Sequence, residues 1–184
     1  GWWEVQWASK ELADEAWSEW VQNKEANEWN EKYASVLQCD GEARNGFNSV
    51  FPIASSQYSE LPDSGYFYSE VHLCELSDGS SQEEAIAFLS GFTEAVGNAD
   101  YSDTSYHLGN YFYTDDTNGF LWANFTNSEA SMNKANASFE ESVRESMFPI
   151  FSEFASCGDV PDLYHGYTLY NADNKEFMPT FMSN

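Results

Sequence analysis

The residues best suited to acid–base chemistry are a carboxylate and an imidazole two positions apart. Glu70 and His72 lie in YFYSEVHLCEL (66–76), whose aromatic and β-branched residues predict a strand. Side chains two apart in a strand emerge on the same side, with Cα atoms about 7 Å apart. A carboxylate in this position can orient the imidazole as a general base or keep it protonated. A solvated surface pair would have the same spacing, so this alternative stays open.

Strand alternation adds further residues to the pair. Strands are also predicted at 2–7 and within FLWANFT (120–126). One side of the predicted strands is apolar and is expected to lie beneath helices: Trp3, Val5, Trp7, Phe67, Val71, Leu73, Leu121, Ala123 and Phe125. The other side mixes polar and aromatic groups, as a ligand cavity requires: Glu4, Gln6, Tyr68, Glu70, His72, Cys74, Phe120, Trp122 and Asn124.

These residues support two site hypotheses. In an enzyme, His72 would act as the base, Glu70 would orient it and Asn124 would stabilise an oxyanion. In a binding protein, the ligand would contact these side chains: Glu4, Gln6, Tyr68, Trp122, His165 and Tyr167. A histidine that occupies a core position and bonds a nearby hydroxyl is the alternative for His165.

Metal and cofactor signals are weak. No two histidines have the spacing of metal ligands, and no CxxC pair occurs, so no metal site is predicted. No cofactor is predicted either, although His72 or His165 could ligate a haem iron. Among the three cysteines we expect one disulfide and one buried thiol. Cys39 and Cys157 are the disulfide candidates, and Cys74 is expected to be an inert buried thiol.

The composition and net charge indicate which kinds of partner the chain could bind. Hydrophobic residues make up 42% and aromatic residues 17%, which indicates a folded chain. The net charge of −24 disfavours nucleic acids and anionic lipids, and such acidity suits a saline environment. No apolar run approaches the ~18 residues of a membrane helix. The sequence begins at Gly1 without Met, which fits a processed export product or a tag remnant, so a secreted or periplasmic protein is expected.

The chain also suggests an internal repeat. Shifting the sequence by 118 positions aligns Trp7 with Phe125 and Cys39 with Cys157, so 2–54 and 120–172 are interpreted as two copies of one βαβ unit. Chance resemblance is the alternative. The predicted organisation is a βαβ half-module (1–54), a linker (55–65), a βαββαβ module (66–172) and a tail (173–184).

Caps and breakers delimit the predicted helices. Ser9 caps the first helix, which should break near NKEAN (23–27). Ser81 and Glu84 form a capping box for a middle helix that stops at Gly97. Asn127 should cap a later helix that Pro149 kinks or splits. Asn118 and Gly119 mark a tight hairpin turn before 120–126.

A family resemblance follows from this order of elements. FLWANFTNSEASM (120–132) is a strand ending in Trp-x-Asn before a polar helix cap, and with the tandem arrangement it resembles the dimeric α/β-barrel superfamily, including antibiotic-biosynthesis-type monooxygenases. The resemblance spans about 1–172. It implies an α+β fold with a ferredoxin-like βαββαβ module, antiparallel sheets covered by helices and a cavity for small hydrophobic molecules. The chain departs from the family in lacking the first strand and helix of one module.

Three functions remain after this reasoning. The first is a secreted or periplasmic acidic protein that binds a small hydrophobic or aromatic molecule in a cavity between sheet and helices. The second is a cofactor-independent oxygenase or isomerase on the same scaffold. The third is a structural or assembly protein that uses aromatic sheet edges. A homodimer is expected because the missing strand leaves a sheet edge unpaired.

Overall fold

The computed structural model describes residues 1–38, 44–54, 57–58, 65–115 and 118–170. The chain divides into two compact units, Gly1–Arg44 and Asn45–Asn184. The predicted half-module ended at residue 54, whereas the strand at 47–53 belongs to the sheet of the second unit. Most of the predicted linker and the whole predicted tail lie outside the described residues.

The first unit contains two capped helices. The hydroxyl of Ser9 accepts a hydrogen bond from the Leu12 amide at 3.3 Å and starts α1 (Lys10–Gln22). The break expected near NKEAN is confirmed at Asn23, whose extended backbone ends α1. The side chain of Asn23 accepts from the Ala26 amide at 3.0 Å and caps α2 (Lys24–Tyr33).

The strand predicted at 2–7 is not formed, so this prediction is wrong. Trp3 and Val5 are 59% and 44% exposed rather than buried beneath helices. The Trp7 ring packs on the Trp17 ring of α1, with centroids 5.5 Å apart. An alternating pattern becomes a strand only where a neighbouring strand supplies hydrogen bonds, and none of the described strands pairs with 2–7. The predicted repeat therefore loses the first element of its first copy.

The second unit is an α+β fold with a six-stranded antiparallel sheet. The strand order is β1-β3-β4-β2-β5, and β6 also pairs with β2. This arrangement is compatible with a ferredoxin-like fold. The strands are β1 (Phe47–Ile53), β2 (Tyr66–Leu76), β3 (His107–Tyr113), β4 (Gly119–Thr126), β5 (Ala155–Cys157) and β6 (Asp162–Tyr167).

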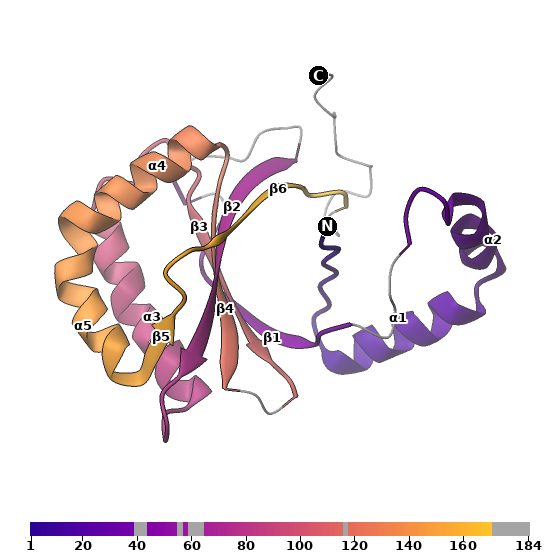
Figure 1. The fold of residues 1–184 in the computed structure, drawn as a ribbon, viewed down its shortest axis with the longest axis horizontal. Coiled ribbons are helices and arrows are strands. Elements are labelled where there is room, and N and C mark those ends of the chain that lie inside the picture. The colour runs from indigo at the N-terminus through magenta and orange to yellow at the C-terminus, as the bar shows by residue number, and fades with distance from the viewer. Residues whose placement is uncertain (39–43, 55–56, 59–64, 116–117, 171–184) are drawn as a thin grey trace. The chain divides into compact units, whose positions relative to one another are not determined.

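The helices of the second unit lie on one side of its sheet (Figure 1). The predicted capping box is confirmed, since Ser81 and Glu84 bond each other's backbone amides at the start of α3 (Gln82–Gly97). The cap of α4 (Glu129–Ser138) is Ser128 and not the predicted Asn127. A π-helical turn, η1 (Phe139–Val143), separates α4 from α5 (Arg144–Phe154). Pro149 lies inside α5, so the interruption precedes the proline.

The side of the sheet that the helices cover is opposite to the predicted one. Cys74, Phe120 and Leu76 pack in one buried cluster with Ala85 of α3 and Phe154 of α5. Trp122 packs on Phe92 of α3 at a centroid distance of 5.0 Å. Leu73 alternates with Cys74 and is 57% exposed. The alternation was therefore predicted correctly, but the predicted apolar side is the one that α3, α4 and α5 leave open.

Both sides of these strands are rich in apolar groups, which explains the error. Phe120 and Trp122 alternate with Leu121 and Ala123 in β4, so hydrophobicity alone does not identify the covered side. Glu70 and Asn124 on the covered side are tolerated because they are hydrogen-bonded, as described below.

Candidate functional site

The predicted catalytic residues share one side of the sheet. Glu70 of β2 lies directly opposite Asn124 of β4, and His72 lies opposite Trp122. This side faces the helices rather than an open space. Glu4 and Gln6, which were predicted to line the same cavity, lie in the first unit outside the sheet, where the Gln6 amide donates to Glu4 at 2.6 Å.

The side chains of Glu70, His72 and Asn124 each have different hydrogen-bonding partners. The Asn136 amide of α4 donates to Glu70 Oε2 at 3.0 Å. His72 Nδ1 lies 3.4 Å from the Gly158 carbonyl oxygen. Asn124 Oδ1 accepts from Tyr106 Oη at 2.8 Å and from Trp122 Nε1 at 3.2 Å. Within the described residues, Glu70 and His72 make no hydrogen bond to each other, so the base-and-orienter arrangement is not formed in this state.

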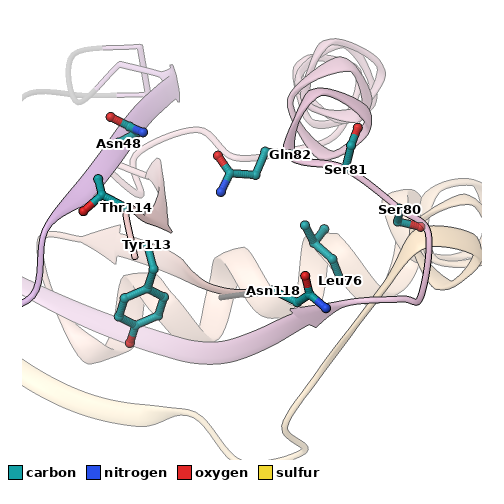
Figure 2. Close-up of a pocket in the computed structure, with 8 residues that line it drawn as sticks. All are labelled: Asn48, Leu76, Ser80, Ser81, Gln82, Tyr113, Thr114 and Asn118. Atoms are coloured by element: carbon teal, nitrogen blue, oxygen red, sulfur yellow. The ribbon is translucent and has the colours of Figure 1, made fainter. Parts of the chain in front are cut away.

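Aromatic rings fill the space around Trp122. Its ring lies 5.0 Å from Phe92, 5.7 Å from Phe151 and 6.4 Å from Phe88, measured between centroids. Open surface hollows away from Trp122 in the described part of the second unit include the two that follow. One lies at the start of α3 (Figure 2). The other is lined by Gln57, Tyr58, Ala99, Asp100, Tyr101, Ser102 and Asp103.

Three of the predicted ligand residues meet at the pairing of β2 with β6. Tyr68 lies opposite His165, and Tyr66 lies opposite Tyr167. Tyr66 Oη is 2.7 Å from His165 Nδ1, and the direction of this hydrogen bond depends on the imidazole tautomer. We refer to Tyr66, Tyr68, His165 and Tyr167 as the tyrosine–histidine cluster.

The rings of the tyrosine–histidine cluster are in mutual contact. Tyr68 meets His165 edge-on at 5.4 Å, and Tyr66 meets Tyr167 edge-on at 5.5 Å, between centroids. Tyr68 is buried, whereas His165 is exposed and the two other tyrosines are half-buried. The cluster thus offers an aromatic surface with one imidazole at its solvent side.

Two carboxylates, Glu70 and Glu129, lie near the tyrosine–histidine cluster. Burial raises the pKa of Tyr66, and the nearby Tyr167 and Glu129 raise it further. Burial likewise raises the pKa of Tyr68, with added contributions from Glu70 and Glu129. Both carboxylates place negative charge near the cluster, in keeping with the net charge of the chain.

Tyr66 is the member of the cluster that the sequence analysis missed. It lies two positions before Tyr68 in the same strand, so alternation alone places both hydroxyls on one side. What alternation does not provide is the register of β6 against β2, which brings His165 within hydrogen-bond distance of Tyr66.

A disulfide joins Cys74 of β2 to Cys157 of β5. These residues are directly opposite in the two antiparallel strands, with Cα atoms 3.9 Å apart. The expectation that Cys74 is a free buried thiol is therefore wrong. Cys157, one of the two predicted disulfide candidates, does form a disulfide, but with Cys74. Cys39 lies outside the described residues.

Metal-ligating side chains do not gather in the part of the chain that the structure describes. No group of three or more His, Cys, Asp or Glu residues is placed there to hold a metal ion. Within the same residues, no helix combines the length and the apolar character needed to cross a membrane.

The observed features define an acidic α+β protein whose helices cover one side of an antiparallel sheet. Comparisons with protein-family models, with curated proteins and with solved structures gave no match. Its function must therefore be argued from its own side chains.

Proposed function

We propose that the second unit is a small-ligand-binding module and that the tyrosine–histidine cluster is its binding surface. The observation that carries this proposal is the 2.7 Å contact between Tyr66 Oη and His165 Nδ1, with the rings of Tyr68 and Tyr167 beside it. A phenol–imidazole pair among aromatic rings offers both stacking area and a fixed hydrogen-bonding group, which are the usual components of ligand sites.

The surroundings favour a small hydrophobic or aromatic ligand that is not an anion. Aromatic rings contact flat apolar ligands with large areas. Glu70 and Glu129 lie close enough to raise tyrosine pKa values, and a negative potential repels anions. A neutral ligand with one hydrogen-bonding group fits best.

The test uses indole as a neutral aromatic probe and indole-3-acetate as its anionic counterpart. Titrations followed by NMR chemical shifts should show that indole perturbs Tyr66, Tyr68 and His165, and that the acetate binds at least about tenfold more weakly. His165→Ala and Tyr66→Phe should each weaken indole binding. Tyr164→Ala is the matched control, because Tyr164 alternates with His165 and lies on the other side of β6. Equal binding by the His165→Ala variant would contradict the proposal.

A second candidate is an oxygenase or isomerase that uses His72, Glu70 and Asn124 without a cofactor. The observation favouring it is that two hydrogen bonds fix the Asn124 carboxamide, so that its amino group points in a defined direction. His72→Ala separates this function from binding. Lost turnover with retained affinity favours catalysis, whereas parallel loss of both favours binding.

A third candidate is self-assembly through the open side of the sheet. Leu73 and Phe51 on this side are 57% and 42% exposed. A homodimer through edge pairing is less suitable, because Pro52 in edge strand β1 has no N–H to donate and the register of β1 shifts between Val50 and Ile53.

We also propose that the second unit is a ferredoxin-like module and that the protein is located in an oxidising compartment. Four strands in the order β6–β2–β4–β3, with helices after β2 and β4, support the ferredoxin-like arrangement. The Cys74–Cys157 disulfide supports a secreted or periplasmic location, because such bonds persist in oxidising environments. The net charge of −24 supports a saline one.

A further inference from the structure

Two triplets of the sequence match the acceptor pattern for N-linked glycosylation, Asn-Phe-Thr at 124–126 and Asn-Ala-Ser at 136–138. In this pattern the asparagine carries the glycan, and the modification takes place in the secretory pathway of eukaryotic cells. Such triplets also arise by chance, so the sequence alone does not separate a used site from an unused one. The structure does separate the two asparagines, since they differ in burial and in hydrogen bonding.

Asn124 of β4 is unsuited to carry a glycan in the folded protein. Its carboxamide oxygen accepts from Tyr106 Oη at 2.8 Å and from Trp122 Nε1 at 3.2 Å, beneath the helices. Turning this carboxamide outward to carry a sugar would break both hydrogen bonds and leave the buried Tyr106 hydroxyl without its partner. Thr126, the third residue of the triplet, is completely buried. A chain that is modified at Asn124 therefore cannot complete this fold.

Asn136 of α4 is exposed and can keep its contact when it is modified. Its Nδ2 donates to Glu70 Oε2 at 3.0 Å. A carboxamide nitrogen has two hydrogens, and glycosylation replaces one of them, so the other can still donate to Glu70. Asn133 and Glu140, about one turn before and after Asn136, are also exposed, so an attached sugar extends into solvent there.

The helix around Asn136 does not prevent the modification, because α4 depends on tertiary packing. A helix of 10 residues is marginal in water by itself, so the triplet at 136–138 is accessible in the nascent chain. The Ser138 hydroxyl, which the acceptor pattern requires, donates to the Asp100 carbonyl oxygen only once the chain has folded. Folding then decides which modified chains are viable: those with a glycan on α4 can fold, and those with one on Asn124 cannot.

We propose that Asn136 is an N-glycosylation site and that Asn124 is not. The donor is a lipid-linked oligosaccharide pyrophosphate. Asn136 Nδ2 forms a bond to the anomeric carbon of the donor sugar, the bond from that carbon to the pyrophosphate oxygen breaks, and Nδ2 loses one proton. No atom is oxidised or reduced. The proposal rests on the secreted location proposed above and does not depend on ligand binding at the tyrosine–histidine cluster.

The test expresses the full chain behind a cleavable signal peptide in cultured human cells and measures the intact mass of the secreted protein. Peptide-N-glycosidase should lower this mass by one glycan and convert Asn136 to aspartate, which peptide mapping locates. A secreted wild type without a glycan, or with a glycan on Asn124, would overturn the proposal. The signal peptide supplies export and the indole titration measures ligand binding, so a failure here is distinct from a failure of either of those proposals.

Two substitutions of Ser138 locate the site. Ser138→Ala removes the triplet but leaves Asn136 and its hydrogen bond to Glu70 in place, so the glycan should be lost. Ser138→Thr preserves the triplet and is the matched control, so the glycan should remain. Circular dichroism should show the same fold for both variants. Since Ser138→Ala leaves 124–126 as the remaining triplet, a glycan that persists in this variant would lie on Asn124 and refute the assignment.

Discussion

Glu70 and Asn124 are tolerated under the helices because both are hydrogen-bonded. The Asn124 carboxamide oxygen receives hydrogen bonds from Tyr106 and Trp122, and Glu70 receives one from Asn136. A buried polar group without a partner costs about 1–3 kcal/mol, so this network is what allows amide and carboxylate groups beneath α3 and α4. Asn110 is the exception, because its buried Oδ1 has no partner among the described residues.

Tyr106 gives a prediction at the residue scale. Its hydroxyl is buried, and burial raises its pKa well above the ordinary value; burial also raises the pKa of Tyr101. Unfolded tyrosines ionise near pH 10, whereas these two stay protonated in the folded state. The unfolded state therefore binds fewer protons above pH 10, so stability is fully present below that pH and falls above it, by up to about 1.4 kcal/mol per pH unit for each tyrosine.

Urea unfolding between pH 8 and pH 11 measures this effect. Tyr106→Phe should lower the free energy of unfolding at pH 8 by about 1 kcal/mol, because the bond to Asn124 is lost. The same variant should show a shallower loss of stability above pH 10. At pH 8 tyrosines are protonated in both states, so the change in the free energy of unfolding there measures the lost hydrogen bond alone. Only the change in slope above pH 10 reports ionisation. An unchanged slope above pH 10 would show that Tyr106 ionises equally in both states.

Among the elements, β2 connects most of the second unit. It pairs with β4 on one side and with both β5 and β6 on the other. The register with β6 forms the tyrosine–histidine cluster, and the register with β5 places Cys74 opposite Cys157. The short strand β5 follows α5 directly, so the disulfide also fixes the end of that helix against the sheet.

Removal of this disulfide is the prediction at the scale of elements. The bridge spans 83 residues, and in the chain-entropy account a loop of this size contributes up to about 4–5 kcal/mol. Cys157→Ala together with Cys74→Ala should lower the midpoint of urea unfolding accordingly. Alkylation followed by intact mass should label both residues in the wild type only after reduction. Labelling of Cys74 before reduction would contradict the bridge.

At the scale of the whole molecule, the sheet of the second unit has one covered and one open side. The buried clusters lie between the sheet and α3, η1 and α5. The open side carries contacting aromatic rings, such as Phe47 and Phe51 against Tyr111. A large exposed apolar surface is a common feature of interfaces.

The open side leads to a prediction about oligomeric state. If two copies associate through it, light scattering should give the mass of a dimer for the wild type and of a monomer for Leu73→Asp, because the new charge would be buried in the interface. Val160→Asp is the matched control, since Val160 is 85% exposed outside the sheet and should leave the dimer intact. A monomeric wild type would refute self-assembly through this surface.

The net charge of −24 gives a second prediction at this scale. Like charges repel each other in the compact state, and salt screens this repulsion. The thermal midpoint should therefore rise as NaCl is added and level off as the Debye length falls from about 10 Å at 0.1 M to about 3 Å at 1 M. Scanning calorimetry measures the midpoint, and a midpoint that falls with NaCl would count against adaptation to saline conditions.

The sequence by itself determined the local features of this protein. The α1–α2 break at Asn23, the capping box of α3 and the position of β2 all follow from interactions within a few residues. Alternation also grouped Glu70, His72, Trp122 and Asn124 on one side of the sheet. Caps and pleats are local geometry, so a single sequence contains the necessary information.

Only the tertiary structure decided which groups meet and which side is covered. The segment 2–7 has a strand-like pattern but forms no strand, because strand formation depends on a pairing partner. Cys74 pairs with Cys157, and Tyr66 reaches His165, because of strand registers that no spacing reveals. The helices cover the side with Trp122 rather than the side with Leu73. Both sides are apolar enough to be buried, so the choice depended on packing across the whole sheet.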